Sequence, residues 1–131
     1  MASSTPLEII TQLYEALGRG EASSVLPLLD PDIEWTEAEG FPLAGTFHGP
    51  QAVIENVLMR LAEDWQGFQT APDELVDGGS TIVALGHYSG TNKASGKSFR
   101  APFAHVWTVR DGKATRYVQY TDTWLVHQAL A

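Results

Sequence analysis

The stretch IEWTEAEGF, residues 33–41, carries three glutamates beside a tryptophan and a phenylalanine. Apolar and polar residues alternate in it, which predicts a strand whose side chains point to opposite faces in turn. Trp35 and Glu37 then share one face, whereas Glu34 lies on the other face and Glu39 falls in the turn that follows. We therefore interpret Glu34 and Glu39 as surface residues, and Glu37 as a carboxyl group among apolar side chains.

Two later stretches place one titratable group on an aromatic strand face in the same way. In APFAHVWTV, His105 shares a face with Phe103 and Trp107. Asp122 lies within RYVQYTDTWLV and shares its face with Val118, Tyr120, Trp124 and Val126. Taken alone, His105 is more often a satisfied core histidine, and Asp122 could pair with a threonine, an arginine or a backbone N–H. Glu37 taken alone could be a surface residue, if its strand ends early. Three such groups on three strands favour one shared apolar cavity.

A buried acid or base must be paired, neutral or beside a water-filled cavity, because burying an unpaired charge is costly. In such a cavity Glu37 would abstract or relay a proton, since apolar surroundings raise the pKa of a carboxyl group. His105 would donate a hydrogen bond to an oxyanion. Tyr14 lies on the apolar face of an expected helix, where it could equally be a packing residue whose hydroxyl group reaches water. Asp122 would act as a second acid or would fix the tautomer of His105. Aromatic side chains would bind the ligand as walls of the cavity: Trp35, Phe103, Trp107, Tyr120 and Trp124.

The composition argues against several other classes of protein. The chain of 131 residues has a formal net charge of −8, which argues against nucleic acid and anionic membranes as partners. It has no cysteine and no HxH or HExxH spacing, so we expect no metal site. Glycine-rich phosphate loops and serine-elbow motifs are absent, and we expect no cofactor. Neither a signal peptide nor a run of ~20 apolar residues is recognisable, which predicts a cytoplasmic protein.

The expected elements are helices first and strands afterwards. Thr5, Pro6 and Glu8 are typical of a capped helix start, and Gly18 and Gly20 end that helix. A short helix over 22–29, a strand over 33–37, and a short strand with a helix over 45–65 come next. Four further strands are expected at about 68–76, 81–90, 98–109 and 114–126, bounded by turn residues. This order predicts a single α+β domain with a curved antiparallel sheet.

The whole chain resembles the ketosteroid-isomerase-related, polyketide-cyclase-like (SnoaL-like) branch of the nuclear-transport-factor-2-like superfamily. The resemblance rests on YEALGRGE, LLDPDIEWTEAEGFPLAGTFHGPQAV, APFAHVWTV and VQYTDTWL, in that order. It implies a cystatin-like α+β barrel, in which a cone-shaped, curved antiparallel sheet wraps three N-terminal helices and encloses a pocket open at one end. It also implies one SnoaL-like domain over residues 1–131 and a homodimer packed through the sheet.

The resemblance also implies roles for particular residues. Ketosteroid isomerases place a tyrosine, a carboxylate base and a protonated aspartate around this pocket, and these positions match Tyr14, Glu37 and His105. An imidazole in place of the aspartate departs from the pattern and puts steroid isomerisation as such in doubt. Polyketide cyclases use a late-strand acid, for which Asp122 is the counterpart. No arginine lies on these apolar faces, which disfavours the Asp-Arg-Asp arrangement of limonene-epoxide-hydrolase-like members.

Two hypotheses about function follow. The first is a cofactor-independent acid–base enzyme of isomerase, cyclase or lyase type, acting on a small apolar carbonyl compound bound in the cone pocket. The alternative is a non-catalytic protein of the same fold that binds a small apolar molecule, with Glu37, His105 and Asp122 satisfying one another. A mutually hydrogen-bonded triad that leaves no open void would favour the binding protein, whereas convergence of the three groups on an empty pocket would favour the enzyme. A scaffold or dimer module is a third possibility, and its cone would be filled by side chains.

Overall fold

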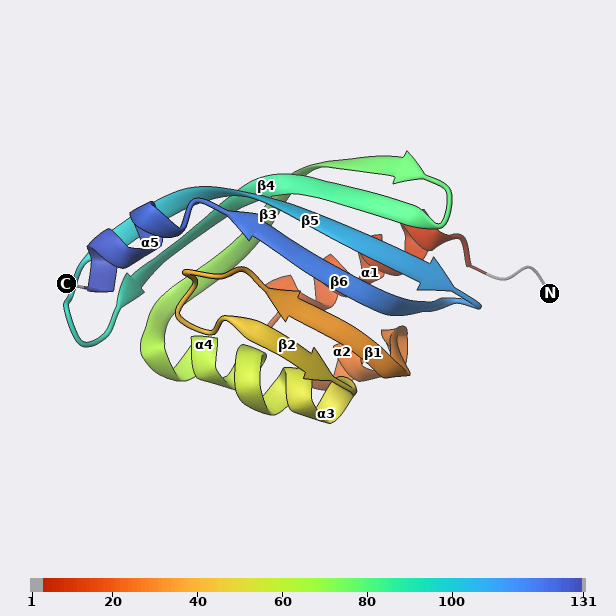
Figure 1. Cartoon of the computed structure of the whole chain (residues 1–131), viewed down its shortest axis with the longest axis horizontal. Helices are drawn as coiled ribbons and strands as arrows, with labels where there is room; N and C mark the ends of the chain where they lie inside the picture. Colours follow the sequence, from red (N-terminus) through yellow and green to blue (C-terminus); the bar gives the residue numbers. More distant parts are fainter. Residues whose placement is uncertain (1–3, 131) are drawn as a thin grey trace.

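The computed structural model describes residues 4–130 and contains a curved, six-stranded sheet with helix α1 behind it in the view of Figure 1. The helical segments are α1 (Pro6–Gly18), α2 (Ala22–Val25), η1 (Leu26–Leu28), α3 (Pro50–Val53), η2 (Ile54–Leu58), α4 (Met59–Asp64) and α5 (Thr123–Leu130). The strands are β1 (Leu29–Glu37), β2 (Gly45–His48), β3 (Trp65–Gly78), β4 (Thr81–Asn92), β5 (Ser98–Arg110) and β6 (Lys113–Thr121).

The sheet is mixed, and its two edges are not joined. Its strand order is β2-β1-β6-β5-β4-β3, and neighbouring strands are antiparallel except for β1 and β6. The α+β class is confirmed, whereas the expected purely antiparallel sheet is wrong at this one pair. The parallel pair arises because the chain leaves β2 through the α3–α4 helix to the far edge of the sheet, and then returns through three hairpins.

Helix α1 begins and packs as its sequence predicts. The Thr5 hydroxyl accepts a hydrogen bond from the backbone N–H of Glu8, and the Glu8 carboxylate accepts one from the Thr5 N–H. This reciprocal capping box satisfies two N–H groups that the helix itself leaves without partners. The buried face of α1 lies against β3, β4, β5 and β6 and comprises Ile9, Ile10, Leu13, Tyr14 and Ala16.

The helix over residues 50–64 covers the other end of the sheet and contains a π-helical turn. It begins at Pro50 and continues through α3, η2 and α4, seen as one rod below β1 and β2 in Figure 1. Val53 and Val57 on its inward stripe are almost fully buried. A π-turn widens the helix locally and is often found at functional sites. Here it carries Val57 and Leu58, which both line the cavity described below.

The chain after Thr121 forms a helix, and the expected strand over 114–126 is wrong at this end. The Asp122 carboxylate accepts a hydrogen bond from the backbone N–H of Leu125, as a helix-capping aspartate does. Val126 and Ala129 are the buried residues of α5 and lie three positions apart, which is helical spacing. The alternation through Tyr120, Asp122 and Trp124 suggested a longer strand because a capping aspartate fits either pattern.

The inward face of β6 is also the opposite of the expected one. From the turn at Asp111, β5 and β6 pair in register as far as Val109 and Ala114, after which Thr108 pairs with Arg116. Thr115 is therefore an extra, bulged residue. Because side chains alternate between faces, one extra residue exchanges the two faces of the rest of the strand. His105 consequently lies opposite Gln119, and not opposite Val118.

Gly86 allows β4 to fit between its neighbours. A Cβ atom at this position would lie 2.2 Å from the carbonyl oxygen of Ala71 and 2.8 Å from the ring of Phe103. Only glycine leaves this space, and the Phe103 ring can therefore pack directly against the backbone of β4. Across residues 4–130, no helix is both long enough and apolar enough to cross a membrane.

Candidate active site

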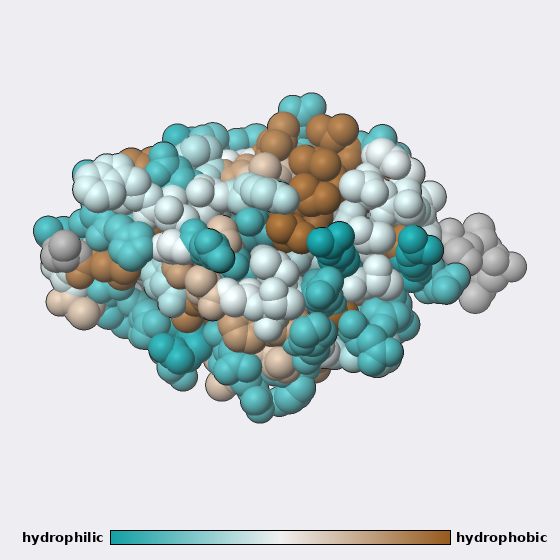
Figure 2. Space-filling model, in the orientation of Figure 1, coloured by the Kyte–Doolittle hydropathy of each residue, from teal (hydrophilic) through white to brown (hydrophobic). Residues whose placement is uncertain are grey.

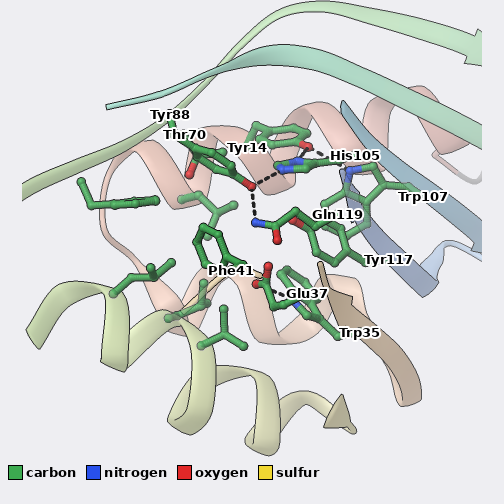
Figure 3. A pocket seen from close by; sticks show the side chains of 15 residues that line it. Tyr14, Trp35, Glu37, Phe41, Thr70, Tyr88, His105, Trp107, Tyr117 and Gln119 are labelled. Carbon is green, nitrogen blue, oxygen red and sulfur yellow. Dashed lines mark hydrogen bonds between the residues drawn. The ribbon is translucent and has the colours of Figure 1, made fainter. Parts of the chain in front are cut away.

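A small cavity of about 40 Å³ lies between the inner face of the sheet and the helices (Figure 3). It combines apolar walls with a few polar groups, as ligand sites usually do. Its fifteen lining residues are Tyr14, Leu17, Trp35, Glu37, Phe41, Val57, Leu58, Leu61, Phe68, Thr70, Tyr88, His105, Trp107, Tyr117 and Gln119.

Glu37 places a buried carboxyl group at this cavity. Its side chain comes from the last residue of β1, and the residue is only 3% exposed. Oε1 accepts a hydrogen bond of 3.1 Å from the Trp35 indole N–H, whereas Oε2 has no partner among residues 4–130. Burial raises the pKa of Glu37 to about 7, although the Trp35 hydrogen bond opposes the rise. A carboxyl group with this pKa can take up and release a proton near neutral pH.

His105 bridges two tyrosine hydroxyl groups on the other side of the cavity. Its Nδ1 lies 2.5 Å from the Tyr14 hydroxyl, and its Nε2 lies 2.5 Å from the Tyr88 hydroxyl. The indole N–H of Trp107 also donates to the Tyr14 hydroxyl, at 2.9 Å. His105 is 2% exposed, and burial holds its pKa well below the usual value, so the ring is neutral. Both ring nitrogens therefore contact tyrosine hydroxyl groups, and neither is free to bond a molecule in the cavity.

Gln119 connects this network to the end of β1. Its side-chain oxygen accepts a hydrogen bond of 3.0 Å from the backbone N–H of Ala38, the residue after Glu37. Its side-chain nitrogen donates to the Tyr88 hydroxyl at 2.9 Å. Burial raises the pKa of Tyr14 and of Tyr88, so both hydroxyl groups keep their protons and act as hydrogen-bond donors.

Aromatic rings hold these polar groups in place. Trp35 lies against Tyr117 and edge-on to Trp107, with ring centroids 3.9 Å and 5.5 Å apart. Phe103 stacks on His105 with centroids 3.9 Å apart and the ring planes within 9°. Phe103 therefore supports the imidazole from behind and does not line the cavity. Trp35 and Trp107 do line it, where the sequence predicted ligand-binding walls.

Besides Phe103, three residues of the predicted site do not line the cavity, and these three lie away from it. Asp122 is exposed and caps α5, so the structure does not bring it to His105. Tyr120 is 57% exposed and Trp124 is 68% exposed, and neither lines the cavity. The bulge at Thr115 turns Tyr120 outward, and the helix that begins after Asp122 carries Trp124 away.

The sequence did not single out several residues that the structure brings to the cavity. Tyr117 and Gln119 take the inward positions on β6 because of the same bulge. Tyr88 reaches inward from β4, where both alternating faces of the strand contain apolar residues and neither is favoured. The remaining lining residues that were not predicted are Leu17, Phe41, Val57, Leu58, Leu61, Phe68 and Thr70. The one available signal for Tyr88 was its position on the same alternating face as Ile82 and Ala84.

A larger groove of about 540 Å³ adjoins the cavity. It lies between the end of α1, the α4 helix and β3. Five of its lining side chains also line the cavity, so the two hollows share one boundary. These shared residues are Leu17, Leu58, Leu61, Phe68 and Thr70. Within residues 4–130 no cluster of three or more histidine, aspartate or glutamate side chains is arranged to hold a metal ion.

Comparisons with known proteins identify related chains. Residues 10–117 match the model of the SnoaL-like domain. An NTF2-like protein from Burkholderia thailandensis is 42% identical, with a TM-score of 0.96 and 98% of each chain covered. An NTF2-like protein of unknown function from Burkholderia pseudomallei is 31% identical, with a TM-score of 0.87 and 98% of each chain covered. TerC, co-crystallised with polyporic acid, is 31% identical and has a TM-score of 0.87. The match covers 97% of this chain and 98% of TerC. No curated protein matches.

Proposed function

The chain belongs to the SnoaL-like domain family, and from its buried carboxyl group we propose that it is a cofactor-independent acid–base enzyme acting on a small apolar carbonyl compound. The observation that supports this most strongly is Glu37: it is buried, its pKa is about 7, and its Oε2 atom has no partner among the described residues. An unsatisfied buried carboxylate is costly to stability, which is typical of a functional group.

The proposed step is proton abstraction next to a carbonyl group. Glu37 Oε2 takes a proton from the α-carbon, and the C–H electron pair forms the C=C bond of an enolate. The carbonyl π electrons move to the oxygen, whose charge is stabilised by a hydrogen bond from a tyrosine hydroxyl group of the network that His105 joins, Tyr14 or Tyr88. Protonated Glu37 then returns the proton to the same or another carbon, which gives exchange or isomerisation. Cyclisation or elimination would begin with the same abstraction.

The linings of the cavity and the groove support a neutral, apolar substrate. Their described residues include two acids, Glu37 and Glu21, and no lysine or arginine. The cavity of about 40 Å³ has room for a reacting group but not for a whole ligand, since ligand pockets usually measure roughly 300–1,000 Å³. We propose that the carbonyl end enters the cavity and that the rest of the molecule lies in the groove. The co-crystallisation of TerC with polyporic acid supports a small-molecule site in this fold.

We also propose that two copies pack through the outer face of the sheet. Val83, Val106 and Val118 lie side by side across β4, β5 and β6 on that face. Exposed apolar residues adjoin them, namely Val76, Leu85 and Tyr120, and Figure 2 shows an apolar patch over β4 and β5. Apolar patches of this kind commonly mark protein interfaces.

The dimer proposal is tested by light scattering after size exclusion. Leu85→Lys should give a monomer, because one charge would be buried in each half of the interface. Gln51→Lys adds the same charge on α3, away from this face, and should leave a dimer. A monomeric wild-type protein would contradict the proposal.

Hydrogen exchange tests the enzymatic proposal without knowledge of the natural substrate. The protein is incubated in D₂O with a panel of cyclic ketones and enones, and loss of the α-proton NMR signal is followed. We expect catalysed exchange by the wild type and at least a hundredfold slower exchange by Glu37→Gln. Ketones that bind, as shown by thermal stabilisation, but never exchange would contradict the proposal and favour the non-catalytic binding protein.

A further inference from the structure

Thr70 is the polar member of the boundary between the cavity and the groove. Five side chains line both hollows, and the other four are apolar: Leu17, Leu58, Leu61 and Phe68. We propose that Thr70 is a specificity-determining residue, whose hydroxyl group binds a second oxygen of the ligand, a neutral hydroxyl or carbonyl group remote from the reacting carbonyl. The inference rests on the proposed function and narrows its substrate class.

The pairing of β3 with β4 fixes the direction of the Thr70 side chain. Thr70 lies directly opposite Tyr88, and directly opposite residues of an antiparallel pair project from the same face of the sheet. Tyr88 projects inward, where its hydroxyl group contacts His105. Thr70 therefore projects inward as well, and Figure 3 shows the two side chains on the same side of the cavity.

The Thr70 hydroxyl group is not used by its neighbours in the cavity. Trp107, Tyr14, His105, Tyr88 and Gln119 form one chain of hydrogen bonds. Thr70 takes no part in the hydrogen bonds drawn among the fifteen lining residues (Figure 3). A threonine hydroxyl group can both donate and accept. It can therefore bond to a ligand oxygen without breaking a bond between lining side chains.

A ligand that crosses this boundary must come to terms with the hydroxyl group. Thr70 is half-buried, so a purely apolar ligand would cut its hydroxyl group off from water and leave it without a partner. A ligand oxygen at this point replaces that cost with a hydrogen bond. Threonine is common in strands, but valine would fill nearly the same space and leave the boundary wholly apolar. The hydroxyl group is thus the feature that distinguishes the two kinds of ligand.

The position of Glu37 shows how far the second oxygen lies from the reacting end. Glu37 is the last residue of β1 and Thr70 lies in β3, with β6, β5 and β4 between these strands in the sheet. Neighbouring strands are ~4.8 Å apart, so the two side chains come from well-separated parts of the curved sheet. A ligand whose α-carbon contacts Glu37 reaches Thr70 only with an atom several bonds away. This favours a ketone with a distal hydroxyl or carbonyl group over a 1,2- or 1,3-dicarbonyl compound.

The charges around the two hollows argue that the second oxygen is neutral. The lining residues include Glu37 and Glu21 but no lysine or arginine. Glu21 is already engaged, since its carboxylate accepts hydrogen bonds from Arg19 at 3.0 Å and from Ser24 at 2.9 Å. A carboxylate on the ligand would thus meet acidic groups without a lysine or arginine of the lining to pair with.

A matched pair of ketones and a matched pair of variants test the inference. The probes are 4-phenyl-2-butanone and 4-(4-hydroxyphenyl)-2-butanone, which differ by one hydroxyl group remote from the ketone. Thr70→Val nearly keeps the shape of the side chain and removes its hydroxyl group, whereas Thr70→Ser keeps a hydroxyl group. Dissociation constants for the full-length proteins are measured by isothermal titration calorimetry, and circular dichroism checks that both variants fold.

The wild type should bind the hydroxylated ketone about threefold to tenfold more tightly than the parent ketone, the gain typical of one hydrogen bond. Thr70→Ser should keep this preference, and Thr70→Val should lose it by weakening only the hydroxylated ketone. No preference or no binding by the wild type, a preference that survives in Thr70→Val, or an equal loss for both ketones would overturn the inference. Failure of ketone exchange with the Thr70 effect intact would instead refute only the proposed enzymatic activity.

Discussion

Glu37→Gln should change how the stability of the protein depends on pH. The pKa of Glu37 rises from 4.5 to about 7 on folding, chiefly because the carboxyl group is buried. Well below pH 4.5 both the folded and the unfolded chain hold this proton. As pH rises towards 7 the unfolded chain releases it and the folded chain does not, so the free energy of unfolding falls. The loss is complete once the pH exceeds the folded-state pKa.

The size of this effect follows from the difference between the two pKa values. Each pKa unit corresponds to about 1.36 kcal/mol, so the full cost of ionising the buried carboxyl group is about 3 kcal/mol. Glutamine has nearly the same shape and no titration. The difference in unfolding free energy, wild type minus Glu37→Gln, should therefore decrease by roughly 2–3 kcal/mol between pH 5 and pH 8.5.

Urea unfolding followed by tryptophan fluorescence measures this difference at each pH. All other titratable groups are the same in the two proteins, so their contributions cancel. Any pH-independent effect of the amide cancels as well, because only the change with pH matters. Two stability curves that run parallel from pH 5 to pH 8.5 would refute the interpretation of Glu37 as a buried group that titrates near neutrality.

Three further substitutions test individual parts of the site and the fold. Trp35→Phe removes the hydrogen bond to Glu37 and should raise the pKa of that carboxyl group above about 7, by roughly one to two units. The pKa is measured by ¹³C NMR, and an unchanged titration midpoint of Glu37 would contradict this prediction. Gly86→Ala should lower the free energy of unfolding in urea by at least about 2 kcal/mol, because the new Cβ would clash with Ala71. Gly18→Ala is the control: it has open space around it and should be neutral or stabilising. Equal effects would argue against the close packing at Gly86. Asp122→Ala should lower the free energy of unfolding by about 1 kcal/mol, because α5 loses its cap. Ligand binding should be unchanged, and weaker binding would show that Asp122 contributes to the site.

The helices that precede β3, and the site residues on α1, β1 and β5, could be predicted from sequence because their signals are local. The capping box at Thr5 and Glu8 defines the start of α1, and helical spacing places Tyr14 on its buried face. Alternation around Trp35 and Glu37 predicts their shared inward face, and both line the cavity. His105 and Trp107 follow from the same rule on β5.

The site residues on β6 depend on a single extra residue in that strand. Alternation alone predicts that β6 presents Val118 and Tyr120 to the cavity, which would hold for a hairpin without a bulge. The extra residue Thr115 exchanges the two faces and brings Tyr117 and Gln119 inward instead. A bulge leaves no clear pattern in one sequence, and the apolar outer face of β6 made the wrong choice more attractive.

The pH dependence of ketone exchange tests the central role of Glu37 most directly. The kcat/KM for α-proton exchange by the wild-type protein should rise with pH through a midpoint near 7, the same midpoint at which the Glu37 carboxyl carbon titrates by ¹³C NMR. Glu37→Gln should show neither the exchange nor the titration. A midpoint near 4.5, or exchange that persists at the wild-type rate in Glu37→Gln, would contradict the assignment of Glu37 as the base.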